Sequence, residues 1–314
     1  NKLWNAGRFI LSNLEGPTRP LAGPHRNVVR KPELTLADRW IIARCDAAVR
    51  EVTQAWERYR LNEAVATAYH FLWSDLADWY IEQVKPRLYG TQPGGDVARA
   101  VLAQVFDVAL RLLHPAMPFI TETLWKRLPG RHAEASISEA PWPRPDDRAT
   151  DPEALADFGL IQELIGAIRS IRAEYGVQPG QPVRVMIGSA SASARRALKA
   201  EEATVLRLAK ASALSQRDGD GAVPGAGHAV LTDGTTVTVP LGELIDLDRE
   251  CGRLGSELSR LAGLIEGQEK KLGNEQFTRR APASVVERER EKLSSWRDQA
   301  DSLRRKRTQL GCAG

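Results

Sequence analysis

The sequence predicts a mainly α-helical protein, and three observations carry this prediction. Apolar residues recur at helical spacing up to about residue 128, with no alternating strand pattern. A short alternating run and an Asp-Gly turn follow in the middle of the chain. The last segment carries two stretches of heptad spacing. We therefore expect an antiparallel helical bundle over 1–145, a small α+β module over 146–243 and a C-terminal antiparallel coiled-coil hairpin over 244–314.

The predicted bundle consists of segments with apolar residues at helical spacing. They cover residues 1–14, about 36–59, about 62–89, and about 97–114 with a continuation over 120–128 after Pro115. Thr35 is a candidate N-cap of the second helix. The third helix is apolar on much of its circumference, which is typical of a helix inside a bundle. The Pro- and Gly-rich stretch over 129–150 marks the end of this part.

The middle of the chain predicts a small module of helices and strands. A helix is expected over about 153–175, a strand over 183–187, and a second helix over about 194–209 with Ser193 as its cap. The stretch 228–240 holds Asp233-Gly234 between β-rich runs, which predicts a hairpin.

The last segment shows spacings of four and three residues, which mark the apolar seam of a coiled coil. The first seam is Leu247, Cys251, Leu254, Leu258, Leu261, Ile265, Gln268 and Leu272, and the second is Val286, Glu289, Leu293, Trp296, Ala300, Leu303, Arg307 and Leu310. Two such helices joined by a short loop bury each other's stripes by folding back antiparallel, over roughly 40 Å at the rise of an α-helix. Gly252, Gly255, Gly263 and Gly267 are expected to weaken this arm.

Composition excludes several classes of protein. The net charge is +4, and basic residues concentrate at the two ends of the chain, which permits a nucleic-acid partner. Three scattered cysteines, Cys45, Cys251 and Cys312, argue against a disulfide framework or a zinc site and favour a reducing cytosol. No apolar run reaches the length of a membrane span. Because the chain starts without Met inside a helix, we expect a fragment whose upstream part is missing.

The residues that carry chemistry are basic and aromatic, since no catalytic constellation is evident. Arg8 lies on the first helix, and Trp40 and Arg44 lie near the start of the second. Arginines bind phosphates, and exposed rings stack on unpaired RNA bases. Spacing alone favours the other interpretation, in which Trp40 is a core residue and Arg8 a solvated charge. Asp75 and Asp78 could hold a metal, but structural ion pairs are favoured.

The basic residues of the arm also allow two interpretations, RNA binding or a solvated face. Arg279 and Arg280 at its tip, and the basic run 304–307 at its base, could clamp an RNA backbone. Charge runs on coiled coils are more often solvated faces.

Several motifs resemble class I aminoacyl-tRNA synthetases. They are Asn1-Lys2-Leu3-Trp4-Asn5-Ala6-Gly7-Arg8-Phe9, Trp73-Ser74-Asp75 with Asp78-Trp79-Tyr80-Ile81-Glu82, and Leu113-His114-Pro115-Ala116-Met117-Pro118-Phe119 with Thr121-Glu122. The first resembles the opening anticodon-domain helix of the valine, isoleucine and leucine enzymes, and the last is a highly specific family signature. Asn274-Glu275-Gln276-Phe277 with Arg280-Ala281-Pro282 resembles the hairpin tip of the valyl family.

The resemblance implies that the bundle holds the anticodon loop of tRNA(Val) and that the arm packs on the tRNA elbow. By position, Arg8 and Trp40 match residues near the anticodon, and Phe106 matches a position that contacts the anticodon end. Gly7 replaces a more usual alanine and is expected to weaken the first helix slightly. No cofactor is expected in this chain, because ATP and Mg would act in an upstream catalytic domain of the same enzyme. The resemblance also implies a cytoplasmic, monomeric protein.

Two alternatives remain open at this stage. One is a stand-alone tRNA-binding protein that reuses a synthetase-like bundle. The other is a helical scaffold with an oligomerisation arm, which predicts no salt-dependent RNA binding.

Overall fold

The computed structural model describes residues 1–14, 33–132, 134–146, 149–188, 191–217, 223–242 and 244–312. Contacts within the chain group it into two compact units. One comprises Asn1–Gly159 with Lys199–Glu201, and the other comprises Leu160–Leu198 with Glu202–Gly314. The mainly α-helical class predicted from the sequence is confirmed. The three-part division with boundaries after residues 145 and 243 stays a prediction.

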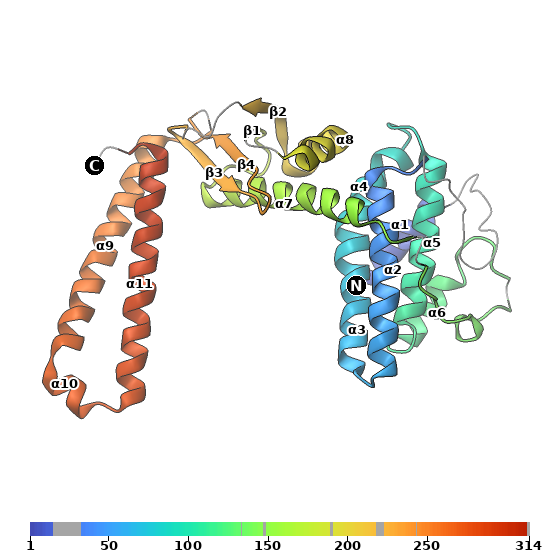
Figure 1. Ribbon diagram of the computed structural model, residues 1–314, viewed down its shortest axis with the longest axis horizontal. Coiled ribbons are helices and arrows are strands. Elements are labelled where there is room, and N and C mark those ends of the chain that lie inside the picture. The colour runs from blue at the N-terminus through green and yellow to red at the C-terminus, as the bar shows by residue number, and fades with distance from the viewer. Residues whose placement is uncertain are drawn as a thin grey trace. The chain divides into compact units, whose positions relative to one another are not determined.

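The first unit is a helical bundle (Figure 1, blue to green). Its elements are α1 (Lys2–Asn13), α2 (Leu36–Glu57), α3 (Leu61–His70), the π-helical η2 (Phe71–Tyr80), α4 (Ile81–Leu88), α5 (Gly95–Leu113), α6 (Pro118–Trp125) and the 3-10 turn η3 (Ile137–Glu139). Helix α7 (Pro152–Glu174) begins in this unit and ends in the other. One continuous core joins the bundle helices, and Phe71, Tyr80 and Phe106 are among its largest fully buried side chains.

Helix α2 begins at a reciprocal cap between Thr35 and Asp38, as its sequence predicts. The Thr35 hydroxyl accepts a hydrogen bond from the Asp38 N–H at 3.2 Å, and the Asp38 carboxylate accepts one from the Thr35 N–H at 3.0 Å. The cap satisfies two amides that have no partner inside the helix. Asp38 is also fully buried, so the same carboxylate needs further partners within the bundle.

Segment η2 is the main departure from the helix predicted over 62–89. The chain is helical throughout this range, but Phe71–Tyr80 adopts the wider π-helical winding between α3 and α4. Such segments are rare and often occur at functional sites. Here Phe71, Leu72, Leu76 and Tyr80 point into the core, while Trp73 and Asp78 remain accessible to solvent.

Gly7 lets helix α1 approach α6 closely. A Cβ atom built at Gly7 would lie 2.7 Å from the Leu124 side chain, which is itself fully buried. The glycine expected to weaken α1 therefore has a packing reason, because an alanine would overpack the contact with Leu124.

The second unit contains a four-stranded sheet. Its elements are β1 (Val183–Gly188), α8 (Ala192–Ala209), β2 (Ala211–Arg217), β3 (Ala226–Val230) and β4 (Thr236–Pro240), with strand order β2-β1-β4-β3. β1 and β2 are parallel, and the other neighbours are antiparallel. The predicted hairpin is confirmed, with Gly234 in the left-handed region at its turn. The predicted cap is wrong, because Ser191 and not Ser193 accepts the capping bond of α8. Strand β2 was not expected.

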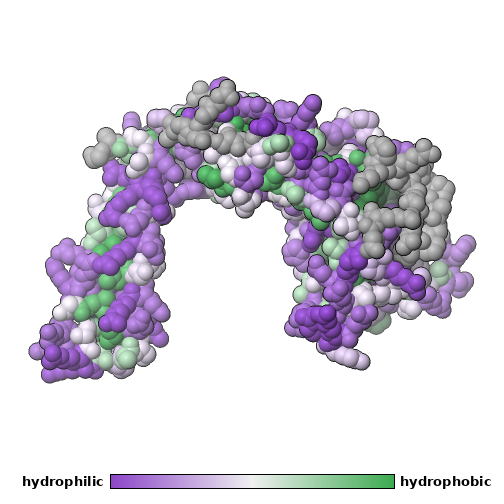
Figure 2. Space-filling view, viewed as in Figure 1, coloured by the Kyte–Doolittle hydropathy of each residue, from purple (hydrophilic) through white to green (hydrophobic). Residues whose placement is uncertain are grey.

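The arm is a hairpin of α9 (Leu247–Gly273), the short α10 (Glu275–Arg280) and α11 (Ala283–Leu310), and α9 and α11 lie side by side (Figure 1, orange to red). Helices of 27 and 28 residues are about 40 Å long, as expected. The buried arm residues all lie on the predicted seams: Leu254, Leu261, Gln268, Val286, Glu289, Ala300 and Leu310. A band of apolar residues along the arm is visible in Figure 2.

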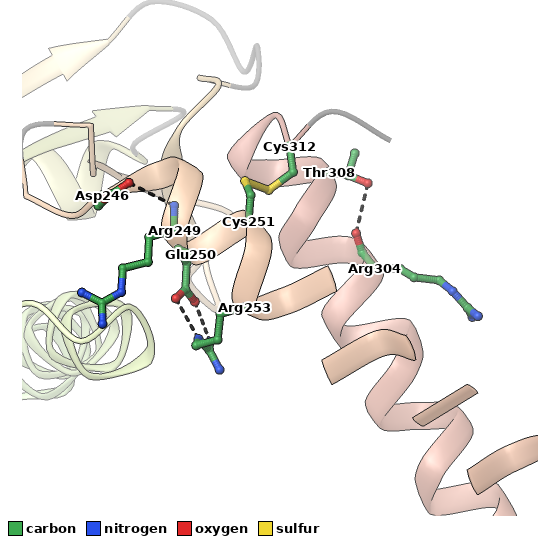
Figure 3. The surroundings of a disulfide bond; sticks show 8 residues. All are labelled: Asp246, Arg249, Glu250, Cys251, Arg253, Arg304, Thr308 and Cys312. Carbon is green, nitrogen blue, oxygen red and sulfur yellow. Dashed lines mark hydrogen bonds and ion pairs between the residues drawn. A yellow bond between two sulfur atoms is a disulfide. The ribbon is translucent and has the colours of Figure 1, made fainter. Parts of the chain in front are cut away.

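The expectation that the cysteines form no disulfide is wrong. Cys251 and Cys312 are bonded, with Cα atoms 5.6 Å apart (Figure 3). The antiparallel hairpin brings the beginning of α9 beside the end of α11, so residues 61 positions apart meet. Cys45 is a free thiol in the bundle core, and burial raises its pKa.

Candidate nucleic-acid interface

Arg8 is presented to solvent by helix α1. The helix buries Leu3, Gly7 and Ile10 against the bundle, and Arg8 lies on the exposed side. Among the residues that the structure describes, none forms an ion pair with Arg8. Its guanidinium is therefore available to a phosphate or to the edge of a base.

Trp40 does not offer an exposed ring. Its side chain is only 2% exposed and stacks on Phe158 of α7, with ring centroids 4.3 Å apart. Base stacking needs an open ring face, which this structure does not give Trp40, and its contact with an anticodon base stays a prediction. The core position that its spacing alone favoured is the observed one.

Phe106 is likewise a core residue. It lies in the middle of α5 and is completely buried. A direct contact between its ring and RNA would require the bundle to open, and the contact at Phe106 stays a prediction. Its role in this structure is to fill the space between helices.

Arg44 is held by an acidic partner inside the bundle. Its Nε donates to Asp75 Oδ2 at 2.9 Å, and the Asp75 side chain is almost fully buried. Burial raises the pKa of Asp75, and the nearby charge of Arg44 opposes that rise. Asp78 pairs with Lys2. The ion-pair interpretation of Asp75 and Asp78 is confirmed, and the charge of Arg44 is already compensated.

The arm tip carries two exposed residues of the predicted site. Asn274 caps the short helix α10, which holds both Arg279 and Arg280 on its surface. Arg279 pairs with Glu275 at 3.0 Å, but both side chains are more than three-quarters exposed, so the pair is easily exchanged for another anion. Arg280 has no ion-pair partner among the described residues.

The basic run at the base of the arm is more engaged than the tip. Arg304 pairs with Asp301 at 2.7 Å, and Lys306 pairs with Glu174 at 2.7 Å. These contacts favour a structural role for part of this run.

An aromatic and basic surface on the bundle was missed from the sequence. Tyr69 stacks on Trp73 with centroids 5.0 Å apart, and Lys2 Nζ lies 4.2 Å from the centre of the Trp73 ring. Tyr69 is 44% exposed. The signal was the spacing of four between Tyr69 and Trp73, which puts both on one helix face. The apolar circumference of this helix predicted a position inside the bundle and did not separate its buried rings from its exposed ones.

Other exposed rings were missed for a different reason. Tyr59 and Phe119 are each 88% exposed, and both lie beside turns of the bundle, where periodicity carries no information. Near the end of α2, a pocket of about 320 Å³ is lined by Thr53, Trp56, Glu57, Pro115 and Trp142. Its Trp142 Nε1 donates to Thr53 Oγ1 at 2.9 Å.

Two classes of site are not found in the part of the chain that the structure describes. No group of three or more His, Cys, Asp or Glu side chains there could hold a metal ion. None of the helices described is both long and apolar enough to cross a bilayer.

Comparison with known proteins yields two family matches, one that runs from the bundle into the second unit and one on the arm. Residues 38–187 match the family model of the anticodon-binding domain of tRNA ligase, and residues 246–311 match that of the valyl tRNA synthetase tRNA binding arm. The second match begins and ends within one residue of the limits of the hairpin formed by α9 and α11.

Curated relatives cover nearly the whole chain. A valine–tRNA ligase of Carboxydothermus hydrogenoformans is 42% identical over 296 residues, which is 94% of this chain and 32% of that protein. Those of Geobacter sulfurreducens and Bacillus subtilis are 40% and 37% identical, over 96% and 99% of this chain and 34% of each relative. The chain thus spans about a third of the length of the curated relatives it matches.

A helical bundle matched by an anticodon-binding model, followed by a hairpin matched by a tRNA-binding-arm model, defines the tRNA-binding region of an aminoacyl-tRNA synthetase. Among these enzymes, the match of the arm and the curated relatives both point to the enzyme for valine. Over nearly its whole length the chain is similar to the C-terminal region of valine–tRNA ligases, and its hairpin matches the tRNA binding arm of valyl tRNA synthetase.

Proposed function

We propose that this chain grips and positions tRNA(Val) for a valine–tRNA ligase, with the bundle at the anticodon loop and the arm at the tRNA elbow. The observation that carries the proposal is the pair of family matches on two separate ranges of the chain, 38–187 and 246–311. A tRNA is long enough to be bound in two places at once, and two linked contacts strengthen each other through effective concentration.

Exposed cations support the proposal in both parts. Arg8 on α1 and Arg280 on α10 have no ion-pair partner among the described residues, so they can bind phosphate without first breaking an internal pair. On the bundle, the exposed ring of Tyr69 stacks on Trp73, and Lys2, which is paired with Asp78, lies over the Trp73 ring. Aromatic rings next to cations suit the unpaired bases of an RNA loop.

In this proposal the ligase reaction is not carried out by this chain alone. We propose that ATP-dependent joining of valine to tRNA takes place in a catalytic domain upstream, which also holds ATP and Mg. The contribution of this chain is then binding energy and orientation of the tRNA. We also propose that the protein acts in the cytoplasm. We further propose that it is a monomer, because the apolar seams of the arm are paired within one hairpin.

Filter binding with transcripts of tRNA(Val) and of a non-cognate tRNA, each at two salt concentrations, tests this proposal. We expect tighter binding of tRNA(Val) and an affinity that falls linearly with the logarithm of salt concentration. The chain alone should show no valine-dependent exchange between ATP and pyrophosphate. No binding of tRNA(Val) even at low salt would refute the proposal, and equal binding of both transcripts would refute its specificity for valine.

A further inference from the structure

At the open end of the arm, where α9 begins and α11 ends, a disulfide bond joins the two helices. At the other end, the chain itself joins α9 to α11 through α10. At the open end, Cys251 in the second turn of α9 is bonded to Cys312, two residues beyond the end of α11 (Figure 3). The bond therefore closes the hairpin at the point where its helices would otherwise separate most easily.

The end of α11 is built to aim Cys312 back at α9. Gly311 adopts a left-handed conformation with φ of 71°, which strains any residue with a Cβ atom. The Gly311 N–H donates to the Thr308 carbonyl at 3.1 Å, and the Cys312 N–H donates to the Arg307 carbonyl at 3.0 Å. This pair of bonds is the Schellman motif, which reverses the chain at the end of a helix. Cys312 is thus positioned by the backbone and not by the disulfide alone.

The part of α9 around Cys251 has low intrinsic helix stability. Gly252 and Gly255 follow it, and a Cβ atom at either position would touch nothing, so neither glycine has a packing reason. Each lowers the intrinsic stability of the helix. Asp246 caps this end by accepting a hydrogen bond from the Arg249 N–H at 3.0 Å, and Leu254 is the first fully buried residue of the seam. The side chains beside Cys251 in sequence are glycine and charged residues, and its nearest apolar seam neighbours are Leu247 before it and Leu254 after it.

We propose that Cys251 and Cys312 are a reversible oxidation site that latches the base of the arm. A low-molecular-weight disulfide is the oxidant. The thiolate of one cysteine attacks it, the disulfide bond of the oxidant breaks, and one small thiolate leaves. The second cysteine then attacks the mixed disulfide, the protein bond forms, and the second small thiolate leaves. The protein loses two electrons and two protons, and the oxidant is reduced to two thiols.

Opening the latch frees the end of α11. In the dithiol state the last turns keep the buried side chain of Leu310, the ion pair between Lys306 and Glu174 and the contacts of α11 with β3. Chain ends held by a few contacts open more often than the helix interior. The dithiol state is therefore a looser arm at its base, with the middle of the hairpin still closed by its seam.

Cys45 serves as an internal control for this chemistry. It lies in the bundle core, and burial raises its pKa, which keeps the thiol protonated and unreactive. A glutathione buffer should therefore oxidise Cys251 and Cys312 and leave Cys45 reduced.

The experiment equilibrates the chain in glutathione buffers from fully reduced to fully oxidised, then alkylates it under denaturing conditions and measures its mass. We expect one labelled cysteine in oxidised buffer and three in reduced buffer. Hydrogen exchange in residues 300–312 should be roughly tenfold slower in the oxidised chain. Cys312→Ser should exchange at the fast rate in both buffers, with the bundle unaffected.

Two outcomes would overturn the proposal. One is that Cys251 and Cys312 remain thiols, or form only mixed disulfides, in oxidised buffer. The other is equal exchange in residues 300–312 in both states. Because neither readout involves RNA, a failure to bind tRNA would count against the proposed function alone.

Discussion

Arg87 holds both carboxylate oxygens of Asp38 inside the bundle, with its Nη1 2.8 Å from Oδ2 and 2.9 Å from Oδ1. The Tyr80 hydroxyl donates to the same carboxylate at 2.6 Å, and burial raises the pKa of Tyr80 well above its ordinary value. Arg87 also donates to the Gly94 carbonyl at 3.0 Å. One buried ion pair thus links the start of α2 to η2, to α4 and to the turn before α5.

Asp38→Asn should destabilise the bundle strongly. The substitution leaves the guanidinium of Arg87 buried without a counter-charge, and breaking such a pair costs about 3–5 kcal/mol. Urea unfolding followed by circular dichroism measures the loss. Glu63→Gln is the matched control, because it breaks an exposed pair with Arg60 and should cost about 0–1 kcal/mol. Similar losses in the two variants would contradict the role given to Asp38.

Arg8→Ala should weaken tRNA binding without affecting the fold. Arg8 is exposed and contacts no described acidic residue, so its removal takes away only an external contact. If the guanidinium binds a phosphate, the slope of log affinity against log salt should fall by about one. Filter binding over a salt series measures both quantities. Arg8→Lys keeps the charge and should keep the slope, whereas an unchanged slope in Arg8→Ala would remove Arg8 from the interface.

Trp40→Ala should act on stability first. The ring is buried against Phe158, and removal of a buried Trp side chain costs about 3–5 kcal/mol. Thermal unfolding measures this loss. Phe119→Ala is the control, because that ring is 88% exposed and its removal should change stability by no more than about 0.5 kcal/mol. A Trp40→Ala protein that keeps its stability but loses tRNA affinity would place Trp40 in the interface.

Gly263→Ala and Gly267→Ala should each stabilise the arm. A Cβ atom at either position would meet no other atom, so only the gain in helix propensity remains, up to about 1 kcal/mol. Hydrogen exchange within α9 and α11 measures the gain. Gly311→Ala provides the opposite case, because its φ of 71° disfavours a side chain and the last turn should loosen. A loss of arm stability in Gly263→Ala would reveal a contact at that position.

Glu289 should make the arm sensitive to acid. Its carboxylate accepts a hydrogen bond from Gln268 at 2.7 Å and lies 3.0 Å from Lys271 and 3.1 Å from Lys292, and these partners lower its pKa from 4.5 to about 2. A lowered pKa stabilises the folded arm above the unfolded value, and this contribution is lost as pH falls from about 5 towards 2. Helicity and exchange rates of the arm, measured between pH 2 and pH 7, test this.

Glu289→Gln should remove most of this acid sensitivity. Glu266 supplies the comparison, because it pairs with Lys270 on the exposed side of α9 and its pKa is also lowered. Glu266→Gln should leave the acid response largely intact, since exposed pairs contribute little. If both variants respond to acid as the original chain does, Glu289 is not the titrating group.

Periodicity predicted the elements well where side chains repeat. The heptad spacing identified Leu254, Leu261 and Leu310 as seam positions, and it also placed the polar residues Gln268 and Glu289 on the seam, where they bond to each other. It placed Cys251 on the side that faces α11. The disulfide could have been inferred from that position, had the register of the hairpin been followed to its open end.

The roles of single residues were harder to predict, because they depend on the side chains that neighbouring elements bring into contact with them. The resemblance to a family suggested exposed roles for Trp40 and Phe106, although spacing favoured burial of Trp40. The partner of Arg44 is Asp75, on a different helix, and no local pattern could pair them. Strand β2 has no buried residue, because it lies at the edge of the sheet beside β1, so its sequence shows no alternation of apolar and polar side chains.

The π-helical winding of Phe71–Tyr80 sets the rotational phase of everything that follows it in the same helix. Each residue of an α-helix turns the chain by about 100°. Removing one residue from this stretch would favour ordinary winding and would swing Arg87 roughly that far around the axis, away from Asp38. A single-codon deletion in the bundle would therefore be more harmful than many substitutions, and natural changes in length should be confined to the turns.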